Sequence, residues 1–146
     1  MRKTTFPLFA LILLAFSLSA SQTSDSEEII KIVNEAYIDG IQNRGDIDVI
    51  RQGFSADFEM IIFSENNIEK RSIEEWISIV EEQKRTNPGP PENPASAKIL
   101  DVDVTGNLAV VKLELYRQGR KQFTDFLTLH KFDEGWKIVS KTFYRH

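Results

Sequence analysis

Cysteine is absent from the 146 residues, and histidine occurs only twice, as His130 and as the terminal His146. Without cysteine the chain can form neither a disulfide bond nor a thiolate metal site, so its stability must come from packing. No phosphate-binding loop or dinucleotide fingerprint occurs either. We therefore expect neither a metal site nor a cofactor.

Basic residues are too few and too scattered for a nucleic-acid surface. The chain has 18 lysines and arginines against 22 aspartates and glutamates, which gives a net charge of −4. The basic residues are interspersed with acidic ones, and no basic patch is visible. Because nucleic-acid binding depends on clustered positive charge, we expect no nucleic-acid partner.

The chain lacks a hydrophobic run long enough to span a bilayer as an ordinary helix. Its main apolar stretch, Phe6–Phe16, comes after Arg2 and Lys3 and is followed by small residues up to Ala20. This arrangement predicts a secretory signal peptide over residues 1–20. An uncleaved anchor and a buried core helix are the alternatives. We expect an exported protein, periplasmic or secreted.

The remainder of the chain is long enough for one domain, expected over residues 28–146 after a flexible polar lead-in at residues 21–27. The domain begins with a helical pattern of apolar residues four positions apart. These residues are Ile29, Val33, Tyr37 and Ile41.

Two further helices have recognisable starts. Asp46 can cap a short helix whose apolar positions are Ile47, Ile50 and Phe54. Ser72 and Glu75 form a capping box, which predicts a third helix that ends near Arg85. The proline-rich segment 87–94 cannot continue that helix, because proline lacks the amide donor.

Segments of strand-forming composition alternate with turn residues over the rest of the chain. The expected strands are Phe58–Phe63, a short one around Ile68–Glu69, Ala97–Thr105, Leu108–Arg117, and a hairpin from Lys121 to Tyr144. Two helices, a strand pair, a helix and four strands predict an α+β fold with a mainly antiparallel sheet.

The last hairpin carries two finer predictions. Asp133–Gly135 supplies a three-residue turn. In the strand that follows, Trp136 and Ile138 favour one face, whereas Val139 and Phe143 favour the other. A β-bulge near Ile138 would reconcile the two patterns.

These segments, in their order and spacing, resemble the nuclear-transport-factor-2-like superfamily, in the branch described as "putative lumazine-binding". The resemblance implies a cone-shaped fold in which three helices pack on a curved, mainly antiparallel sheet around a pocket, often as a homodimer. It names no ligand. The matching pieces are Tyr37, Gly45-Asp46, Phe54, Trp76, Ile99–Gly106, Phe123–Asp125 and Trp136–Val139.

Within that superfamily the chain is similar to ketosteroid isomerase at the first helix and at Gly45-Asp46. By this resemblance Tyr37 matches, within a residue, a tyrosine that helps to hold an oxyanion. Ile62, however, stands where the isomerase has its aspartate base. Isoleucine cannot accept a proton, so this sequence departs from the isomerase at the residue that carries the chemistry.

Asp125 is the most informative polar residue. Strand alternation places it on one face with Phe123, Leu127 and Leu129. A carboxylate on an otherwise apolar face is a candidate for fixing a ligand or for donating a proton. Alternatively it lies at a rim or pairs with an arginine, Lys112 or Lys121.

The other candidate ligand contacts are apolar. Tyr37 and Trp76 lie on the apolar faces of two helices, and Phe58, Met60 and Ile62 share one face of the first strand. In a cone fold the core and the pocket wall are continuous. The candidate ligand-binding residues are therefore Tyr37, Phe58, Met60, Ile62, Trp76 and Asp125, and the catalytic candidates are Asp125 and Tyr37.

The charged residues of two middle strands mark an outer sheet face. A solvated face and a polar homodimer surface are the two interpretations. The residues are Asp101, Asp103, Lys112 and Glu114, opposite Leu100, Val102, Val111 and Leu113.

Together these patterns favour a protein that binds a small apolar or aromatic molecule without chemistry. One alternative is a cofactor-independent isomerase, cyclase or dehydratase that uses Asp125 and Tyr37. Another is a dimeric accessory module that binds a second protein. A pocket filled by Trp76 and Met60 would favour the module, and two polar groups facing each other across a pocket would favour the enzyme.

Overall fold

The computed structural model describes residues 24–146; the expected signal peptide lies outside them. Residues 24–32 are helical and continue into η1 (Val33–Gln42), which is followed by α2 (Ile47–Gly53) and later by α3 (Ile73–Thr86). The strands are β1 (Phe54–Ser64), β2 (Asn67–Ser72), β3 (Ala95–Thr105), β4 (Leu108–Arg117), β5 (Arg120–Phe132) and β6 (Gly135–Arg145).

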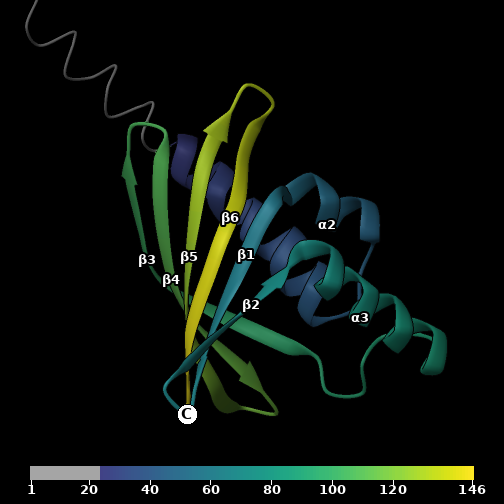
Figure 1. The fold of residues 1–146 in the computed structure, drawn as a ribbon. Coiled ribbons are helices and arrows are strands. Elements are labelled where there is room, and N and C mark those ends of the chain that lie inside the picture. The colour runs from purple at the N-terminus through teal and green to yellow at the C-terminus, as the bar shows by residue number, and fades with distance from the viewer. Residues whose placement is uncertain (1–23) are drawn as a thin grey trace, which may run out of the picture.

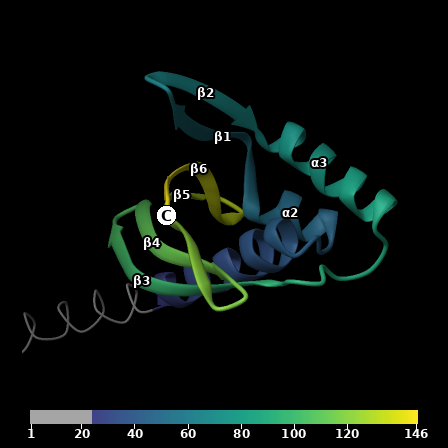
Figure 2. The same ribbon diagram turned by 90° about the horizontal axis from the view of Figure 1, so that it is seen from below.

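The strands form one six-stranded sheet in the order β2-β1-β6-β5-β4-β3. Neighbouring strands are antiparallel except β1 and β6, which are parallel. The sheet is long and curved, and the helices cover one side of it (Figure 1). Seen from below, it curves from β2 round to β3, and the helices lie across its open side (Figure 2). The α+β class and the mainly antiparallel sheet are confirmed.

The predicted order of elements is correct, but several boundaries differ. Phe54 opens β1 instead of ending the second helix, because an extended backbone (φ −105°, ψ 146°) begins there. The lead-in was expected to reach residue 27, yet residues 24–27 are already helical. Phe132 pairs with Gly135, so the last hairpin turns on two residues and not on three.

The capping box forms as predicted and fixes the start of α3. The backbone N–H of Glu75 donates to Ser72 Oγ at 3.2 Å, and the backbone N–H of Ser72 donates to Glu75 Oε2 at 2.8 Å. These bonds satisfy backbone donors that have no partner within the helix. They also fix the direction in which α3 leaves β2, which positions Trp76 one turn later.

The π-helical geometry of η1 was not predicted. Hydrogen bonds in a π-helix run from residue i to i+5, so each turn is wider than in an α-helix. Gln42 therefore lies one turn beyond Tyr37 on the same side, and its Nε2 donates to the Tyr37 hydroxyl at 3.1 Å. The row of apolar residues four apart predicted a helix correctly but did not distinguish its type.

Gly45 lies in the turn between η1 and α2, where the backbone passes too close to η1 for a side chain. A Cβ at this position would lie 2.6 Å from the carbonyl oxygen of Asp39, which is backbone and cannot move aside. The adjacent Asp46 caps α2 as expected, since its carboxylate accepts from the backbone N–H of Asp48 at 2.8 Å. The Gly-Asp step thus positions α2 against the first helix.

The bulge expected near Ile138 is present, one residue further along. Leu129 pairs with Ile138 and Thr128 with Ser140, so Val139 is the extra residue in β6. The bulge reverses the alternation after Ile138. As a result Lys141 and Phe143 turn toward the same side of the sheet as Ile138.

A second bulge changes the outer face. The register of β3 against β4 shifts between Ile99 and Asp101, and Leu100 is 41% exposed. The prediction that Leu100 faces away from Asp101 is therefore wrong, since both side chains are exposed. Val110 and Phe126 are also exposed on this face, which is consequently less polar than expected.

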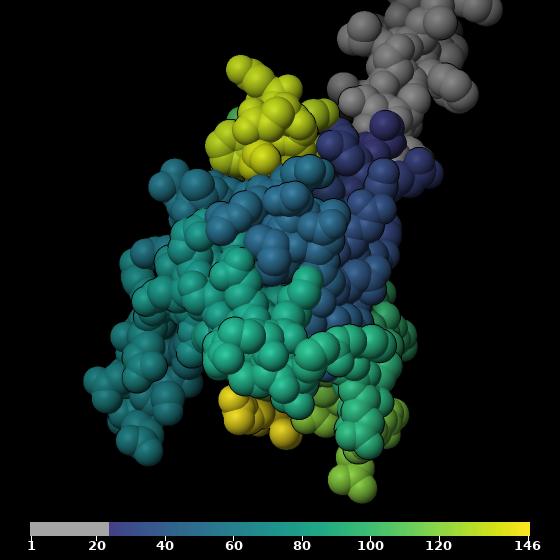
Figure 3. Space-filling view, turned by 90° about the vertical axis from the view of Figure 1, so that its right-hand side faces the viewer, coloured from purple at the N-terminus to yellow at the C-terminus, as the bar shows by residue number. Residues whose placement is uncertain are grey.

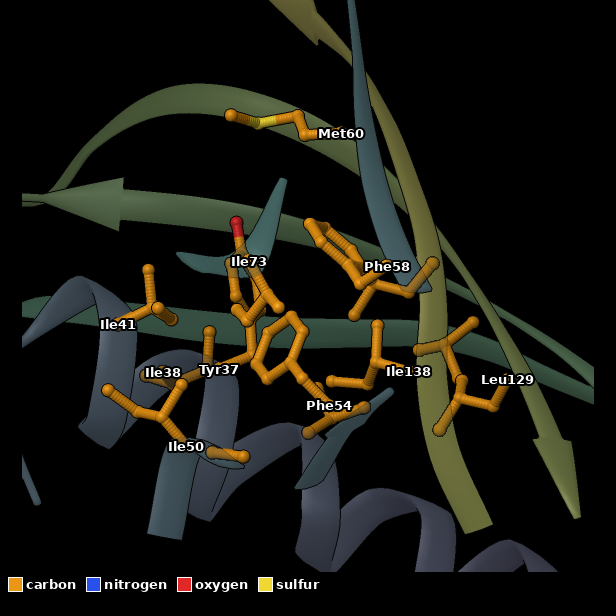
Figure 4. Packing of buried hydrophobic residues seen from close by; sticks show 14 of the residues in the cluster. Tyr37, Ile38, Ile41, Ile50, Phe54, Phe58, Met60, Ile73, Leu129 and Ile138 are labelled. Carbon is orange, nitrogen blue, oxygen red and sulfur yellow. The ribbon is translucent and has the colours of Figure 1, made fainter. Parts of the chain in front are cut away.

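A single hydrophobic core lies between the inner face of the sheet and the helices (Figure 4). Its largest fully buried side chains include Trp136, Tyr37 and Phe58. The indole N–H of Trp136 donates to Asp25 Oδ1 at 3.1 Å, which fastens the first helix to β6. No helix within residues 24–146 is long and apolar enough to cross a membrane.

Candidate functional site

A pocket of about 320 Å³ opens between the inner face of the sheet and α3. A notch is visible between the projecting β1–β2 hairpin and the last residues of β6 (Figure 3). Aromatic and aliphatic side chains form most of the wall, and charged groups lie among them. We call this the aromatic pocket; its lining residues are Tyr37, Gln42, Met60, Ile62, Glu69, Arg71, Trp76, Phe123, Lys141, Phe143 and Arg145.

Trp76 forms the wall on the helix side. It is half-buried, and its ring stacks on Phe58 with centroids 6.0 Å apart and an interplanar angle of 24°. Phe58 itself is 1% exposed and does not line the pocket. Tyr37 also approaches Trp76, at 6.0 Å between ring centroids. The indole is therefore held from behind and from one side, with its remaining surface toward the pocket.

A buried ion pair lies beneath the pocket. Asp125 is 0% exposed, and the Nζ atom of Lys141 lies 2.9 Å from its Oδ1. The other carboxylate oxygen, Oδ2, accepts a hydrogen bond from the Tyr37 hydroxyl at 2.5 Å. A buried carboxylate is tolerated only when it is paired in this way, because desolvating an isolated charge costs several kcal/mol.

The ammonium group of Lys141 is surrounded by aromatic rings. It lies 4.1 Å from the ring centroid of Phe143, 5.8 Å from that of Phe123 and 5.9 Å from that of Trp76. The negative face of an aromatic ring attracts a cation at such distances. Burial lowers the pKa of Lys141, and the negative charge of Asp125 opposes this effect. Lys141 thus reaches the pocket with its charge already balanced.

The hydrogen-bond chain continues from Tyr37 to β4. Gln42 donates to the Tyr37 hydroxyl, and the Arg117 guanidinium donates to the side-chain oxygen of Gln42 at 3.2 Å and to its backbone carbonyl at 2.9 Å. The chain from Asp125 to Arg117 joins strands to the first helix under the pocket. It holds Tyr37 and Gln42 in fixed orientations.

This arrangement limits the chemistry that the site can perform. The single proton of the Tyr37 hydroxyl is directed at Asp125, so it is not available to a ligand carbonyl. Asp125 lies behind Lys141 and Tyr37 and does not line the pocket. Ile62, at the position of the isomerase base, does line it. The pocket surface is therefore suited to binding, and the Asp125 carboxylate is not exposed to a ligand.

Four of the six ligand-binding candidates line the pocket: Tyr37, Met60, Ile62 and Trp76. The other two, Phe58 and Asp125, lie directly behind it. The partner of Asp125 is Lys141, and not an arginine, Lys112 or Lys121, since the bulge in β6 turns Lys141 inward.

Sequence reasoning missed seven of the lining residues: Gln42, Glu69, Arg71, Phe123, Lys141, Phe143 and Arg145. For Lys141 a signal was available in the sequence. Val139, Lys141 and Phe143 are two residues apart, so the lysine shares one face of a strand with two apolar residues. Within residues 24–146, no group of three or more histidine, cysteine, aspartate or glutamate side chains is placed to hold a metal ion.

Tyr37 should remain protonated in alkaline solution for as long as the protein stays folded. Burial, together with the charge of Asp125 and their hydrogen bond, raises the pKa of Tyr37 well above 10.0. Because the unfolded chain ionises first, the stability that this group contributes is complete below pH 10.0 and is lost as the pH rises further.

An ultraviolet titration of tyrosinate in wild type and Tyr37→Phe tests this prediction. The folded proteins should give equal tyrosinate signals, and the denatured proteins should differ by one of the three tyrosines in the chain. A larger signal from folded wild type than from folded Tyr37→Phe would contradict it.

Solved structures with the same fold have low sequence identity to this chain. An NTF2-like protein of unknown function from Shewanella baltica OS155 aligns with a TM-score of 0.67 and 24% identity, over 85% of this chain and 95% of its own. A second, from Silicibacter pomeroyi DSS-3, aligns with a TM-score of 0.66 and 20% identity, over 88% and 98%. At such identities the likeness shows the fold alone.

A third structure, an NTF2-like protein from Cytophaga hutchinsonii ATCC 33406, has a TM-score of 0.61 and 17% identity over 82% of this chain and 98% of its own. No curated protein matches the sequence. The family model described as "Putative lumazine-binding" matches residues 24–144, nearly all of the domain. The chain therefore belongs to this family, and its fold is that of the NTF2-like proteins.

Proposed function

We propose that the protein binds a small aromatic or apolar molecule in the aromatic pocket, without transforming it. The observation that carries this proposal is a cavity of about 320 Å³ walled by Trp76, Phe123, Phe143, Met60 and Ile62. Ligand pockets of proteins typically combine such apolar walls with a few fixed polar groups. The volume is at the lower end of the usual range, which favours a ligand of one or two rings.

The alternatives drawn from the sequence fit this geometry less well. An acid–base enzyme needs a proton acceptor or donor that reaches its substrate, whereas Asp125 and Tyr37 are engaged with each other beneath the pocket. An accessory module was expected to fill its pocket with Trp76 and Met60. Both side chains line an open cavity instead.

Binding can be tested by calorimetric titration with lumazine, the bicyclic compound in the family's name, and with the neutral one-ring probe cinnamamide. Met60→Trp should abolish binding of any compound that occupies the pocket, because the larger side chain fills it. Ile68→Trp is the matched control, since Ile68 is 66% exposed on the same hairpin and lies outside the pocket. Binding that survives Met60→Trp would place the site elsewhere and refute the proposal.

We also propose a homodimer that pairs through the outer face of β4 and β5. Exposed Val110 and Phe126 support this, with exposed fractions of 40% and 39%, and Lys112 lies over the Phe126 ring at 5.5 Å. Apolar side chains grouped on one sheet face are typical of interfaces. Light scattering should give the mass of a dimer for wild type and of a monomer for Phe126→Glu; a monomeric wild type would refute the proposal.

Export is proposed from the sequence pattern of residues 1–20. Protein recovered from outside the cytoplasm should begin between Ala20 and Thr23 when its N-terminus is sequenced. Material that still begins at Met1 would contradict cleavage.

A further inference from the structure

The charged residues of the aromatic pocket are mostly cationic, although the chain as a whole is acidic. Arg71, Lys141 and Arg145 line it, against the single carboxylate of Glu69. Over the whole chain acidic residues outnumber basic ones by 22 to 18. The pocket therefore reverses the charge balance of the protein.

The three cationic side chains differ in whether they are paired with a carboxylate. Lys141 is paired with Asp125 at 2.9 Å. Within residues 24–146, Arg71 and Arg145 form no ion pair and donate no side-chain hydrogen bond, and Glu69 forms no ion pair. The Arg145 guanidinium lies over the face of the Phe123 ring, 5.3 Å from its centroid. In the described part of the chain, no carboxylate is therefore paired with either of these two guanidinium groups at the pocket.

Strand pairing places these cations around the apolar wall. Met60 pairs with Arg71 on one side and with Lys141 on the other, so the three residues form one row across β2, β1 and β6. Arg145 follows Lys141 and Phe143 on the same face of β6 and pairs with Phe123. A ring that lies against Met60 and Phe143 would therefore have guanidinium groups at its edge.

We propose that the pocket selects aromatic anions, and specifically small aryl carboxylates whose anionic group is bound by Arg71 and Arg145. A guanidinium presents paired N–H donors that match the two oxygens of a carboxylate. Arg71 is half-buried, so its attraction for an anion is screened less than that of an exposed arginine. Because Lys141 is already paired with Asp125, the preference for an anion comes from Arg71 and Arg145. This inference rests on the proposed function and adds the charge of the ligand.

Matched pairs of aryl carboxylates and their carboxamides test the inference, because the two members of a pair differ mainly in charge. Benzoate, cinnamate and 2-naphthoate are titrated by calorimetry beside benzamide, cinnamamide and 2-naphthamide. The best carboxylate should bind about tenfold or more tightly than its amide, as expected for hydrogen bonds to a charged group. Added salt should weaken binding of the carboxylate and leave binding of the amide unchanged.

Single substitutions assign the preference to particular residues. Arg71→Gln and Arg145→Gln should each lower the affinity for the carboxylate severalfold and change the affinity for the amide less than twofold. Glu69→Gln should act in the opposite direction and tighten the carboxylate, because it removes the opposing charge. Arg120→Gln, at the start of β5 and outside the pocket lining, is the control and should change the affinity for neither ligand.

The outcomes separate this inference from the proposed function. Equal affinities within each pair, or tighter amides, would overturn the selection of anions and leave binding in the pocket intact. Failure of all six compounds to bind would overturn the selection of aryl carboxylates, and failure of lumazine as well would overturn the proposed function. A preference that survives both arginine substitutions would assign the anion to other residues and also refute the inference.

Discussion

Asp125→Asn should lower the free energy of unfolding by about 3–5 kcal/mol, because it leaves the Lys141 ammonium buried without a counter-charge. Lys141 is 5% exposed and Asp125 is 0% exposed, so little water reaches the pair to replace the lost partner. The asparagine would also exchange the charged acceptor of the Tyr37 hydroxyl for a weaker neutral one. Urea denaturation of the two proteins measures the difference.

The matched control is Asp103→Asn on the outer sheet face. Asp103 is exposed and forms no ion pair within residues 24–146, so the same change should cost less than about 0.5 kcal/mol. The double variant Asp125→Leu with Lys141→Met should recover most of the lost stability, since two well-packed apolar groups can replace a buried pair. A double variant as unstable as the sum of its single variants would contradict the pairing.

The structure assigns Asp125 to a buried ion pair, whereas the sequence suggested a carboxylate of the pocket. Asp125 was recognisable because it interrupts an apolar face, and the structure confirms that this face is buried. Its partner was hidden by the bulge at Val139. Regular alternation from Trp136 and Ile138 places Lys141 on the outside, and one extra residue places it inside. A single irregularity thus decided whether the carboxylate was a free group of the pocket or half of a buried ion pair.

Local signals were the ones that the sequence carried reliably. The capping box of Ser72 and Glu75 and the Gly45-Asp46 step depend on residues close together in the chain, and both form as predicted. The π-helical segment ends at Gln42, which is held by a residue far away in the chain through the hydrogen bonds from Arg117. The apolar spacing of four residues does not distinguish this rare geometry from an α-helix.

The pocket was predictable in outline for the same reason. Trp76, Met60 and Ile62 could be assigned to its wall from helix and strand periodicity, whereas Arg71 and Arg145 could not. Arg71 occupies a short strand whose other residues are nearly all exposed, so alternation gave no inward face. Only the pairing of β2 with β1 shows that this arginine stands beside Met60. Part of the apolar wall was therefore predictable from the sequence, whereas Phe123, Phe143 and the charged residues of the pocket are identified only by the structure.

Trp76→Ala should lower the free energy of unfolding by about 3 kcal/mol and weaken ligand binding roughly tenfold or more. The stability loss follows from the stacking of Trp76 on Phe58 and its contacts with Tyr37 and Phe54. The loss of affinity follows because the same indole offers its remaining surface to the ligand, and aromatic stacking adds to the burial of apolar area.

Stability and binding can be separated by a neighbouring residue. Ile77 is 1% exposed on the same helix and does not line the aromatic pocket. Ile77→Ala should therefore cost a similar 2–5 kcal/mol and leave the affinity for cinnamamide within about twofold. Denaturation and calorimetry on both variants give the four values required. If Ile77→Ala weakens binding as much as Trp76→Ala, the effect of Trp76 is general loosening of the fold, and its assignment to the pocket wall is wrong.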